Sequence, residues 1–212
     1  MITKHGAFCI MSSAHDILFS MDKIVWIDVE TTGLSPFTSD DTLLQIACFV
    51  TDNDLNLLDD EGYEAVVKYD KAGAEAAYAQ ANDFVKNMHS ETGLWDRLTT
   101  DGKTLDVIDQ EVTEYIRRFQ PEPSSAWFGG NSIKLDRDFT SVFLPNLYSH
   151  IHYRSLDVTS FAGVARAWYG FEFEKKKTHD ARDDIMESIE ELRAYRKTIF
   201  VTQDEFRART SN

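Results

Sequence analysis

The sequence predicts an α/β domain in which helices cover a mixed β-sheet. Extended, β-branched segments dominate the beginning of the chain, and short apolar runs then alternate with helical patterns. An apolar fraction of 42% is enough to build a hydrophobic core, so extensive disorder is excluded. A chain of 212 residues fits one domain. We expect that domain at residues 23–200, with a flexible extension at 1–22 and a polar tail at 201–212.

Five segments have the composition of β-strands. Residues 23–29 are continuously apolar and β-branched, as is typical of a strand buried on both faces. Residues 43–51 and 63–69 follow, and an Asp-Asn-Asp sequence after the second segment favours a hairpin turn. We therefore expect these three strands to form an antiparallel meander. Short apolar runs at 125–129 and 155–158 predict a fourth and a fifth strand.

Helical patterns occupy most of the remaining chain. Residues 71–81 are rich in alanine, and we expect residues 82–89 to extend the same helix. In residues 104–119 the apolar side chains recur every three or four positions, which places them on one helix face. Residues 161–169 also predict a helix, and residues 180–199 form the last long periodic segment.

The charge balance limits the possible ligands. With 22 Lys and Arg against 36 Asp and Glu, the net charge is −14, whereas proteins that hold long nucleic acids through phosphates present a basic face. A short nucleic acid, or one approached through divalent metals, is compatible with this charge. No apolar run approaches the length of a membrane span. Because Cys9 and Cys48 cannot build a disulfide framework, we expect a reducing compartment, the cytoplasm.

The first candidate site is the pair Asp28 and Glu30, at the end of the first predicted strand. Residues two apart on a strand point to the same face, and the ends of buried strands open into the crevice where α/β sheets bind ligands. Two adjacent carboxylates repel each other, so a hard divalent cation is a natural partner. The alternative is that one acid points to solvent while the other caps the following turn.

Two later motifs add acids and a histidine. Asp136 and Asp138 follow a Gly-Asn turn after the fourth strand, although helix-start carboxylates also favour the helix dipole without any metal. His179 precedes Asp184 by five residues at the start of the last helix. If His179 lies just before that helix, it can fold over the face carrying Asp184 and act as a general base. Taken alone, a histidine there is more often a cap or a surface residue.

Together these motifs resemble the histidine-containing branch of the DEDD exonuclease superfamily and, within it, the oligoribonuclease family. The resemblance extends from about residue 23 to residue 200 and depends on several separated motifs. These are VWIDVETTGL at 25–34, MHSETGL at 88–94, GNSI at 130–133, DR at 136–137, HYRSLDV at 152–158 and the segment 179–191. The resemblance implies a ribonuclease H-like fold and hydrolysis of short oligoribonucleotides from the 3′ end to nucleoside 5′-monophosphates.

The resemblance also implies a catalytic centre. Two divalent metal ions, Mg²⁺ or Mn²⁺, would be held by four carboxylates, which are Asp28, Glu30, Asp136 and Asp184. His179 would be the general base. In a two-metal site of this kind, one ion lowers the pKa of the attacking water and the other stabilises the leaving oxygen.

For the bases of the substrate, the resemblance implies two contacts. Leu34 would lie between the two terminal bases, and Phe84 would stack on a base where the family usually has tryptophan. The first motif reads Glu-Thr-Thr-Gly, whereas oligoribonucleases typically carry Glu-Met-Thr-Gly. Since Glu-Thr-Thr-Gly is more usual in proofreading exonucleases, the preference for dinucleotides stays open.

Five further residues would recognise the 5′-phosphate. By the same resemblance, Ser132 and His89 would approach it, while Tyr153, Arg154 and Thr159 would come from the partner subunit of a homodimer. An arginine suits this role because its planar guanidinium binds a terminal phosphate through two hydrogen bonds. Such a cap would restrict the enzyme to very short substrates, which need no extended basic track.

Other interpretations remain compatible with the sequence. A DNA proofreading or repair exonuclease could use the same scaffold, as the Glu-Thr-Thr-Gly motif indicates. A nucleic-acid-binding module without activity is a further alternative, although all four carboxylates and the histidine are present. At the periphery, Tyr153 and Trp168 could be core aromatics, and the lysines at 175–177 fit a solvated loop better than a phosphate clamp.

Overall fold

The computed structural model of the chain describes residues 22–175 and 180–210. Within them, five strands form one sheet in the order β3-β2-β1-β4-β5. The pairs β1–β2 and β2–β3 are antiparallel, and β1, β4 and β5 run parallel to one another. The antiparallel start and the mixed sheet confirm the predicted fold class. The strands are β1 (Lys23–Thr31), β2 (Leu43–Asp52), β3 (Tyr63–Val66), β4 (Trp127–Gly130) and β5 (Ser155–Asp157).

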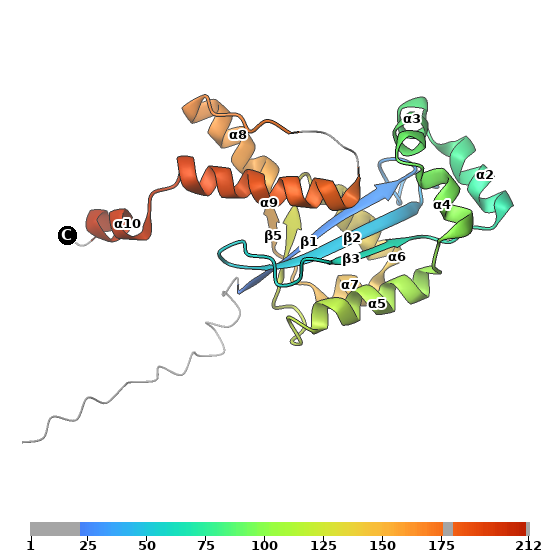
Figure 1. Cartoon of the computed structure of the whole chain (residues 1–212), viewed down its shortest axis with the longest axis horizontal. Coiled ribbons are helices and arrows are strands. Elements are labelled where there is room, and N and C mark those ends of the chain that lie inside the picture. Colours follow the sequence, from blue (N-terminus) through green and yellow to red (C-terminus); the bar gives the residue numbers. More distant parts are fainter. Residues whose placement is uncertain (1–21, 176–179, 211–212) are drawn as a thin grey trace, which may run out of the picture.

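Helices cover both faces of the sheet (Figure 1). The helix α9 packs against β1 and β2 on one face, with α8 beside it, while α5, α6 and α7 cover the other face. At one end of the sheet, α2, α3 and α4 pack together. The helices are α2 (Lys71–Gln80), α3 (Asp83–Glu91), α4 (Leu94–Thr100), α5 (Leu105–Arg117), α6 (Lys134–Phe143), α7 (Pro145–His150), α8 (Val158–Tyr169), α9 (Ala181–Thr198) and α10 (Gln203–Thr210).

The central strand β1 separates two hydrophobic cores, because its side chains alternate between the faces of the sheet. Val25 and Ile27 enter the core that includes residues of α5, α6 and α7. Ile24 and Trp26 enter the core that includes residues of α8 and α9. All four side chains are almost completely buried. The continuously apolar sequence of this strand therefore reflects burial on both faces, as the sequence predicted.

The third strand is shorter than predicted and ends at Val66. The N–H of Val67 still donates to the carbonyl of Leu44 in β2 at 2.8 Å. Beyond it, the N–H of Lys68 donates to the carbonyl of Lys103 at 2.7 Å, and the N–H of Tyr69 donates to the carbonyl of Leu98 at 2.9 Å. These bonds lead the chain away from β2 and toward α4.

The prediction that residues 82–89 extend the preceding helix is wrong. Ala81 and Asn82 have extended backbone angles, so α2 stops before them. The side-chain oxygen of Asn82 accepts a hydrogen bond from the N–H of Val85 at 3.0 Å and caps α3 as a separate helix.

Two short helices, α4 and α7, were not expected from the sequence pattern. In α7, the buried carboxylate of Asp109 accepts hydrogen bonds from the N–H groups of Asn146 and Leu147, each at 2.9 Å. This capping from a distant residue explains why a helix of six residues forms after Pro145. The predicted polar tail contains α10, none of whose residues is buried.

The predicted extension lies outside the described residues except for Asp22. Among the helices of the described ranges, none combines the length and the apolar character that crossing a bilayer requires.

Candidate active site

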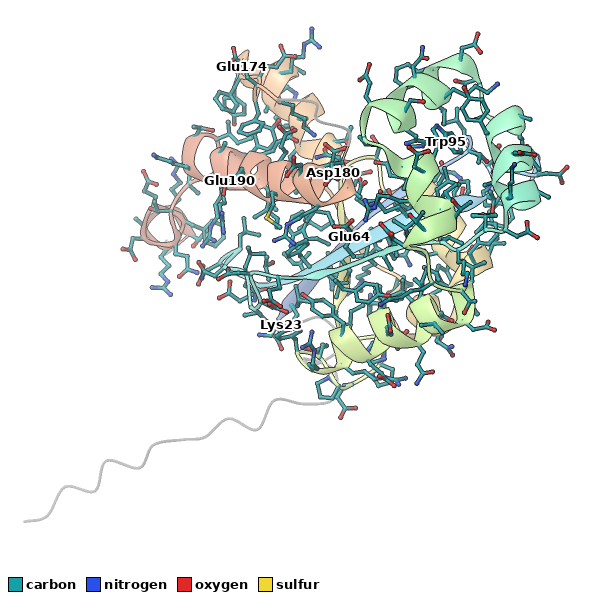
Figure 2. The ribbon with its side chains drawn as sticks, turned by 45° about the vertical axis from the view of Figure 1, so that its right-hand side comes forward. Lys23, Glu64, Trp95, Glu174, Asp180 and Glu190 are labelled. Atoms are coloured by element: carbon teal, nitrogen blue, oxygen red, sulfur yellow. The ribbon has the colours of Figure 1, made fainter. Side chains whose placement is uncertain are left out.

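Asp28 and Glu30 lie on the face of β1 that α9 covers. They share this face with Ile24 and Trp26 because side chains two residues apart on a strand point the same way. Figure 2 shows the start of α9, marked by Asp180, close to the sheet and away from Lys23, where β1 begins. The predicted common orientation of the two carboxylates is thus realised at the far end of the central strand.

Asp184 reaches the same point from α9. The helix is capped by Asp180, whose side chain accepts hydrogen bonds from the N–H groups of Arg182 at 3.1 Å and Asp183 at 3.3 Å. Asp184 follows in the first turn. One carboxylate oxygen from each of Asp28, Glu30 and Asp184 lies within 4.8 Å of the others. Three of the four predicted ligands therefore converge.

The fourth acid, Asp136, approaches from the start of α6. It is almost completely buried, and its Oδ1 accepts a hydrogen bond from the N–H of Val29 at 3.0 Å. This bond places the carboxyl group directly beside β1, between the positions of Asp28 and Glu30 in the sequence. We call these four residues, Asp28, Glu30, Asp136 and Asp184, the acid cluster.

Burial perturbs the acid cluster strongly. Desolvation raises the pKa of Glu30 to about 8 and the pKa of Asp136 to about 7, and it raises the pKa of Asp28 well above its usual range. The charges of Asp136 and Asp184 raise the pKa of both Asp28 and Glu30 further. A divalent cation would stabilise the ionised carboxylates, and oxygen ligands of this kind are those that Mg²⁺ and Mn²⁺ accept. The acid cluster therefore fits a divalent metal.

His179, the predicted general base, lies outside the described residues. Asp180 follows it in the sequence and is among the described residues. It lies close enough to the acid cluster for its charge to raise the pKa of both Asp28 and Glu30. Sequence reasoning missed this fifth acid. Its spacing of four residues before Asp184, about one helical turn, is the signal that could have identified it.

His89, which is predicted to approach the 5′-phosphate, lies at the end of β1. The side chain is fully buried, and its Nε2 lies 3.1 Å from the carbonyl oxygen of Thr31, which can only accept, so Nε2 carries a proton. Its Nδ1 lies 3.8 Å from Oε2 of Glu30. The ring therefore contacts the end of β1 and the carboxylate of Glu30. Its approach to the 5′-phosphate stays a prediction.

Ser132 and Thr159 form one polar site within the same chain. The N–H of Ser132 donates to Oγ1 of Thr159 at 2.9 Å and to Oδ1 of Asp157 at 3.0 Å, and the two hydroxyl oxygens lie 3.2 Å apart. That a partner subunit's Thr159 approaches the 5′-phosphate stays a prediction, while Thr159 of the same chain has a place of its own. It meets Ser132 in its own chain because β4 and β5 are neighbours, so that the segments following them lie side by side.

Leu34 and Phe84 are exposed, as residues that contact bases must be. Their exposed fractions are 80% and 68%. Leu34 stands on a loop that is fixed by Asp41, whose Oδ2 accepts from the N–H of Ser35 at 3.1 Å. At Gly33 a Cβ atom would clash with this carboxylate, so the glycine lets the loop approach Asp41 closely.

Tyr153 and Arg154 stand on the surface rather than in the core. Tyr153 is 74% exposed, and its ring stacks on that of buried His152 with centroids 4.4 Å apart. The Nδ1 atom of His152 accepts a hydrogen bond from the N–H of Arg154 at 2.9 Å. Trp168 is also exposed, so neither it nor Tyr153 is a core aromatic. Of the three lysines, Lys175 is described and pairs with Glu191 at 2.8 Å.

The chain is similar in sequence to known exonucleases. The family model named RNase_T and described as an exonuclease matches residues 25–192. An oligoribonuclease of Leifsonia xyli is 40% identical over 188 residues, which cover 87% of each chain. An oligoribonuclease of Rhodococcus jostii is 42% identical over 186 residues, which cover 86% of this chain and 90% of that one.

A solved structure shows the same fold. An exonuclease I from Methylocaldum szegediense superposes with a TM-score of 0.62 at 19% sequence identity. The match covers 84% of this chain and 41% of that one, so the chain spans about two fifths of its length. At this identity the similarity concerns the fold, which is the predicted ribonuclease H-like arrangement.

Proposed function

The chain belongs to the oligoribonucleases within the RNase_T exonuclease family and is a 3′→5′ exoribonuclease, and we propose that it hydrolyses short oligoribonucleotides by a two-metal-ion mechanism. The products would be nucleoside 5′-monophosphates. The acid cluster would hold two ions, Mg²⁺ or Mn²⁺. The single observation that carries this proposal is the convergence of Asp28, Glu30 and Asp184 within 4.8 Å.

The acid cluster supplies fixed ligands rather than mobile ones. When bound, the metal ions lower the pKa of a water molecule and stabilise the charge that develops on the leaving 3′-oxygen. Asp28 and Glu30 are held in place by β1, and Asp184 by the first turn of α9. The bond from Val29 to Oδ1 of Asp136 leaves the second oxygen of Asp136 for an ion. The chain thus orients its carboxylates before any substrate binds.

His179 would accept the proton of the attacking water. Its role follows from the family motif and from its position directly before Asp180 in the sequence. Asp180 is fixed as the N-cap of α9, one turn before Asp184, so the chain enters α9 at a defined place beside the acid cluster.

The restriction to short substrates would come from residues outside the acid cluster. Leu34 and Phe84 offer exposed apolar surface for bases, and the Ser132–Thr159 site offers hydroxyl groups for a terminal phosphate. Tyr153 and Arg154 would complete this recognition from the partner subunit of a homodimer. A net charge of −14 agrees with a substrate too short to need a basic track.

The test compares two 5′-labelled substrates, a dinucleotide and a single strand of about 20 nucleotides, which is longer than one such site spans. We expect faster cleavage of the dinucleotide, and only when Mg²⁺ or Mn²⁺ is present. Equal or faster cleavage of the longer strand would refute the preference for short substrates. Activity that persists with excess chelator would refute the metal mechanism.

A DNA exonuclease is the second candidate, because the turn after Glu30 reads Thr31-Thr32-Gly33. Degradation of single-stranded DNA as fast as RNA of the same length would favour it. The inactive binding module is tested by Asp28→Ala. We expect the variant to lose an activity that the unmodified protein has, whereas two equally inactive proteins would support the module.

A further inference from the structure

Glu191 is a buried carboxylate that the acid cluster does not use. It lies on α9 seven residues after Asp184, about two turns further along the same helix. Only 3% of the residue is exposed. Its Oε1 accepts a hydrogen bond from the hydroxyl of Tyr195 at 2.6 Å, and its Oε2 accepts from Nζ of Lys175 at 2.8 Å and from Nδ2 of Asn131 at 3.0 Å. A buried charge destabilises the folded state unless hydrogen bonds or an opposite charge compensate it, as they do for Glu191.

The contacts of Glu191 determine the orientation of the Asn131 side chain. A carboxylate can only accept, so the amide atom facing Glu191 must be the nitrogen. The same nitrogen donates to Oγ of Ser188 at 2.8 Å, and the Ser188 hydroxyl itself donates to the carbonyl of Asp184. Both amide hydrogens are therefore engaged, and the amide oxygen must point the other way.

The amide oxygen points at the predicted phosphate site. The hydroxyl of Thr159 donates to Oδ1 of Asn131 at 3.1 Å and accepts from the N–H of Ser132 at 2.9 Å. Since the proton of Thr159 is committed to Asn131, Ser132 must be the donor in its 3.2 Å contact with the Thr159 hydroxyl. The hydroxyl proton of Ser132 is then the one that can turn from Thr159 to a ligand. Ser132 has a φ of +53°, a strained conformation that persists only where surrounding contacts hold it.

A cavity of about 680 Å³ lies beside this network. Asn131 and Thr159 line it together with the ion pairs Lys175–Glu191 and Arg166–Glu172 and with Glu174, so both cationic and anionic side chains border the space. Glu191, Asn131 and Thr159 all line this cavity, so the network can be reached from it.

We propose that Glu191 is a positioning residue for the terminal phosphate: by fixing the amide of Asn131, it holds Thr159 and the strained Ser132 turn in the arrangement that receives the phosphate. This inference rests on the proposed function, in which Ser132 and Thr159 recognise the 5′-phosphate of a short oligoribonucleotide. It assigns a role in substrate recognition to α9, the helix that also carries Asp184.

The test measures kcat and KM for a dinucleotide with a 5′-phosphate and for the same dinucleotide with a 5′-hydroxyl. Glu191→Met removes both acceptor oxygens and keeps a side chain of similar length. We expect its KM for the phosphorylated dinucleotide to rise about tenfold, the scale of one lost hydrogen bond to a charged group. Its kcat, and its KM for the 5′-hydroxyl substrate, should change less than about twofold. Glu191→Gln, which retains a carbonyl oxygen for Asn131 and Lys175, should resemble the unmodified protein.

A compensating pair separates positioning from a general loss of stability. Asn131→Asp directs a carboxylate at Glu191, so we expect the same loss of phosphate-dependent affinity as in Glu191→Met. In the double variant Asn131→Asp/Glu191→Gln, the new amide can donate to the new carboxylate, and the second oxygen of that carboxylate still accepts from Thr159. We expect KM to return to within about threefold of the unmodified value. Glu190→Gln, on the exposed neighbour of Glu191 (Figure 2), is the matched control.

The outcomes distinguish this inference from the proposed function. An unmodified protein that cleaves neither dinucleotide would overturn the proposed function, and one that ignores the 5′-phosphate would overturn both. If the unmodified protein prefers the phosphorylated substrate but Glu191→Met keeps that preference, the role of Glu191 alone is wrong. An equal rise in KM for both substrates would show that Glu191 has only a structural role. A double variant whose KM is as high as that of Asn131→Asp would lead to the same conclusion.

Discussion

The acid cluster and the exposed residues proposed to contact the substrate are built in opposite ways. The acid cluster is fixed by β1 and by the starts of α6 and α9, and burial desolvates the carboxyl groups of Asp28, Glu30 and Asp136. Leu34, Phe84 and Tyr153, which we call the rim, project into solvent. Repulsion between the carboxylates therefore destabilises the metal-free folded state, and a bound cation would remove this repulsion. The rim residues cause no such repulsion. Substitutions in the cluster should change chemistry and metal-free stability together, and substitutions in the rim should change substrate affinity alone.

Asp136→Asn should have the largest effect. The variant removes a charge from the acid cluster but keeps an oxygen that can accept from the N–H of Val29. We expect kcat to fall at least about 100-fold, since even residues that merely orient metal ligands contribute 10–100-fold. Without metal, the melting temperature at pH 8 should rise, because the repulsion is smaller. A variant with normal turnover would show that Asp136 is not a ligand.

His89→Phe tests whether buried His89 orients the Glu30 carboxylate of the acid cluster. The phenyl ring fills the space but loses the contact with Thr31 and the polar edge facing Glu30. We expect kcat to fall about 10–100-fold, the range for residues that orient metal ligands.

His150→Phe is the matched control for His89, because His150 is also buried and its Nε2 lies 2.9 Å from a backbone carbonyl, that of Gln120. Both variants should lose about 1–3 kcal/mol of unfolding free energy, measured by denaturant titration. Only His89→Phe should lose activity. Equal activities in the two variants would show that His89 does not orient the Glu30 carboxylate.

Tyr153→Ala examines the rim. We expect KM for a dinucleotide with a 5′-phosphate to rise about tenfold with kcat and melting temperature unchanged, the effect of losing one hydrogen bond to a charged group. Trp168→Ala is the control, because the exposed fractions of Tyr153 and Trp168 are 74% and 75%. A dilution series that follows KM and subunit association together tests whether Tyr153 acts across a homodimer. If activity does not depend on subunit association, Tyr153 acts on the active site of its own chain.

The smallest effect concerns stability alone. The pKa of Glu30 is raised from 4.5 to about 8 in the folded chain, so between these pH values the folded state binds more protons than the unfolded state. Stability without metal should therefore fall as pH rises through this window, lowering the melting temperature by on the order of 5–10 °C. Saturating Mg²⁺ should remove the fall. A melting temperature of the metal-free protein that rises with pH would contradict the burial of the cluster.

The sequence was most informative where the relevant contacts are local. The period of two in a strand places Asp28 and Glu30 on one face, and the first turn of a helix places Asp184, so both could be predicted without neighbours. The cap that separates α2 from α3 was also local, and Asn82 at that position could have identified it.

What could not be predicted depends on packing between distant segments. His89 is buried because α3 packs at the end of β1, which no short motif encodes. Thr159 meets Ser132 because β4 and β5 are adjacent, although the two residues are 27 positions apart. Asp109 caps α7 across 37 residues for the same reason. Such contacts are specified by the sheet order as a whole rather than by any local pattern.

The single helix α9 carries Asp184 in its first turn and Glu191 about two turns later. If Asp184 binds a metal ion and Glu191 positions the terminal phosphate, as proposed, α9 fixes the distance between the site of cleavage and the bound end of the substrate, because one helix carries both residues. We expect mutations that bend α9 to weaken the preference for short substrates before they abolish cleavage.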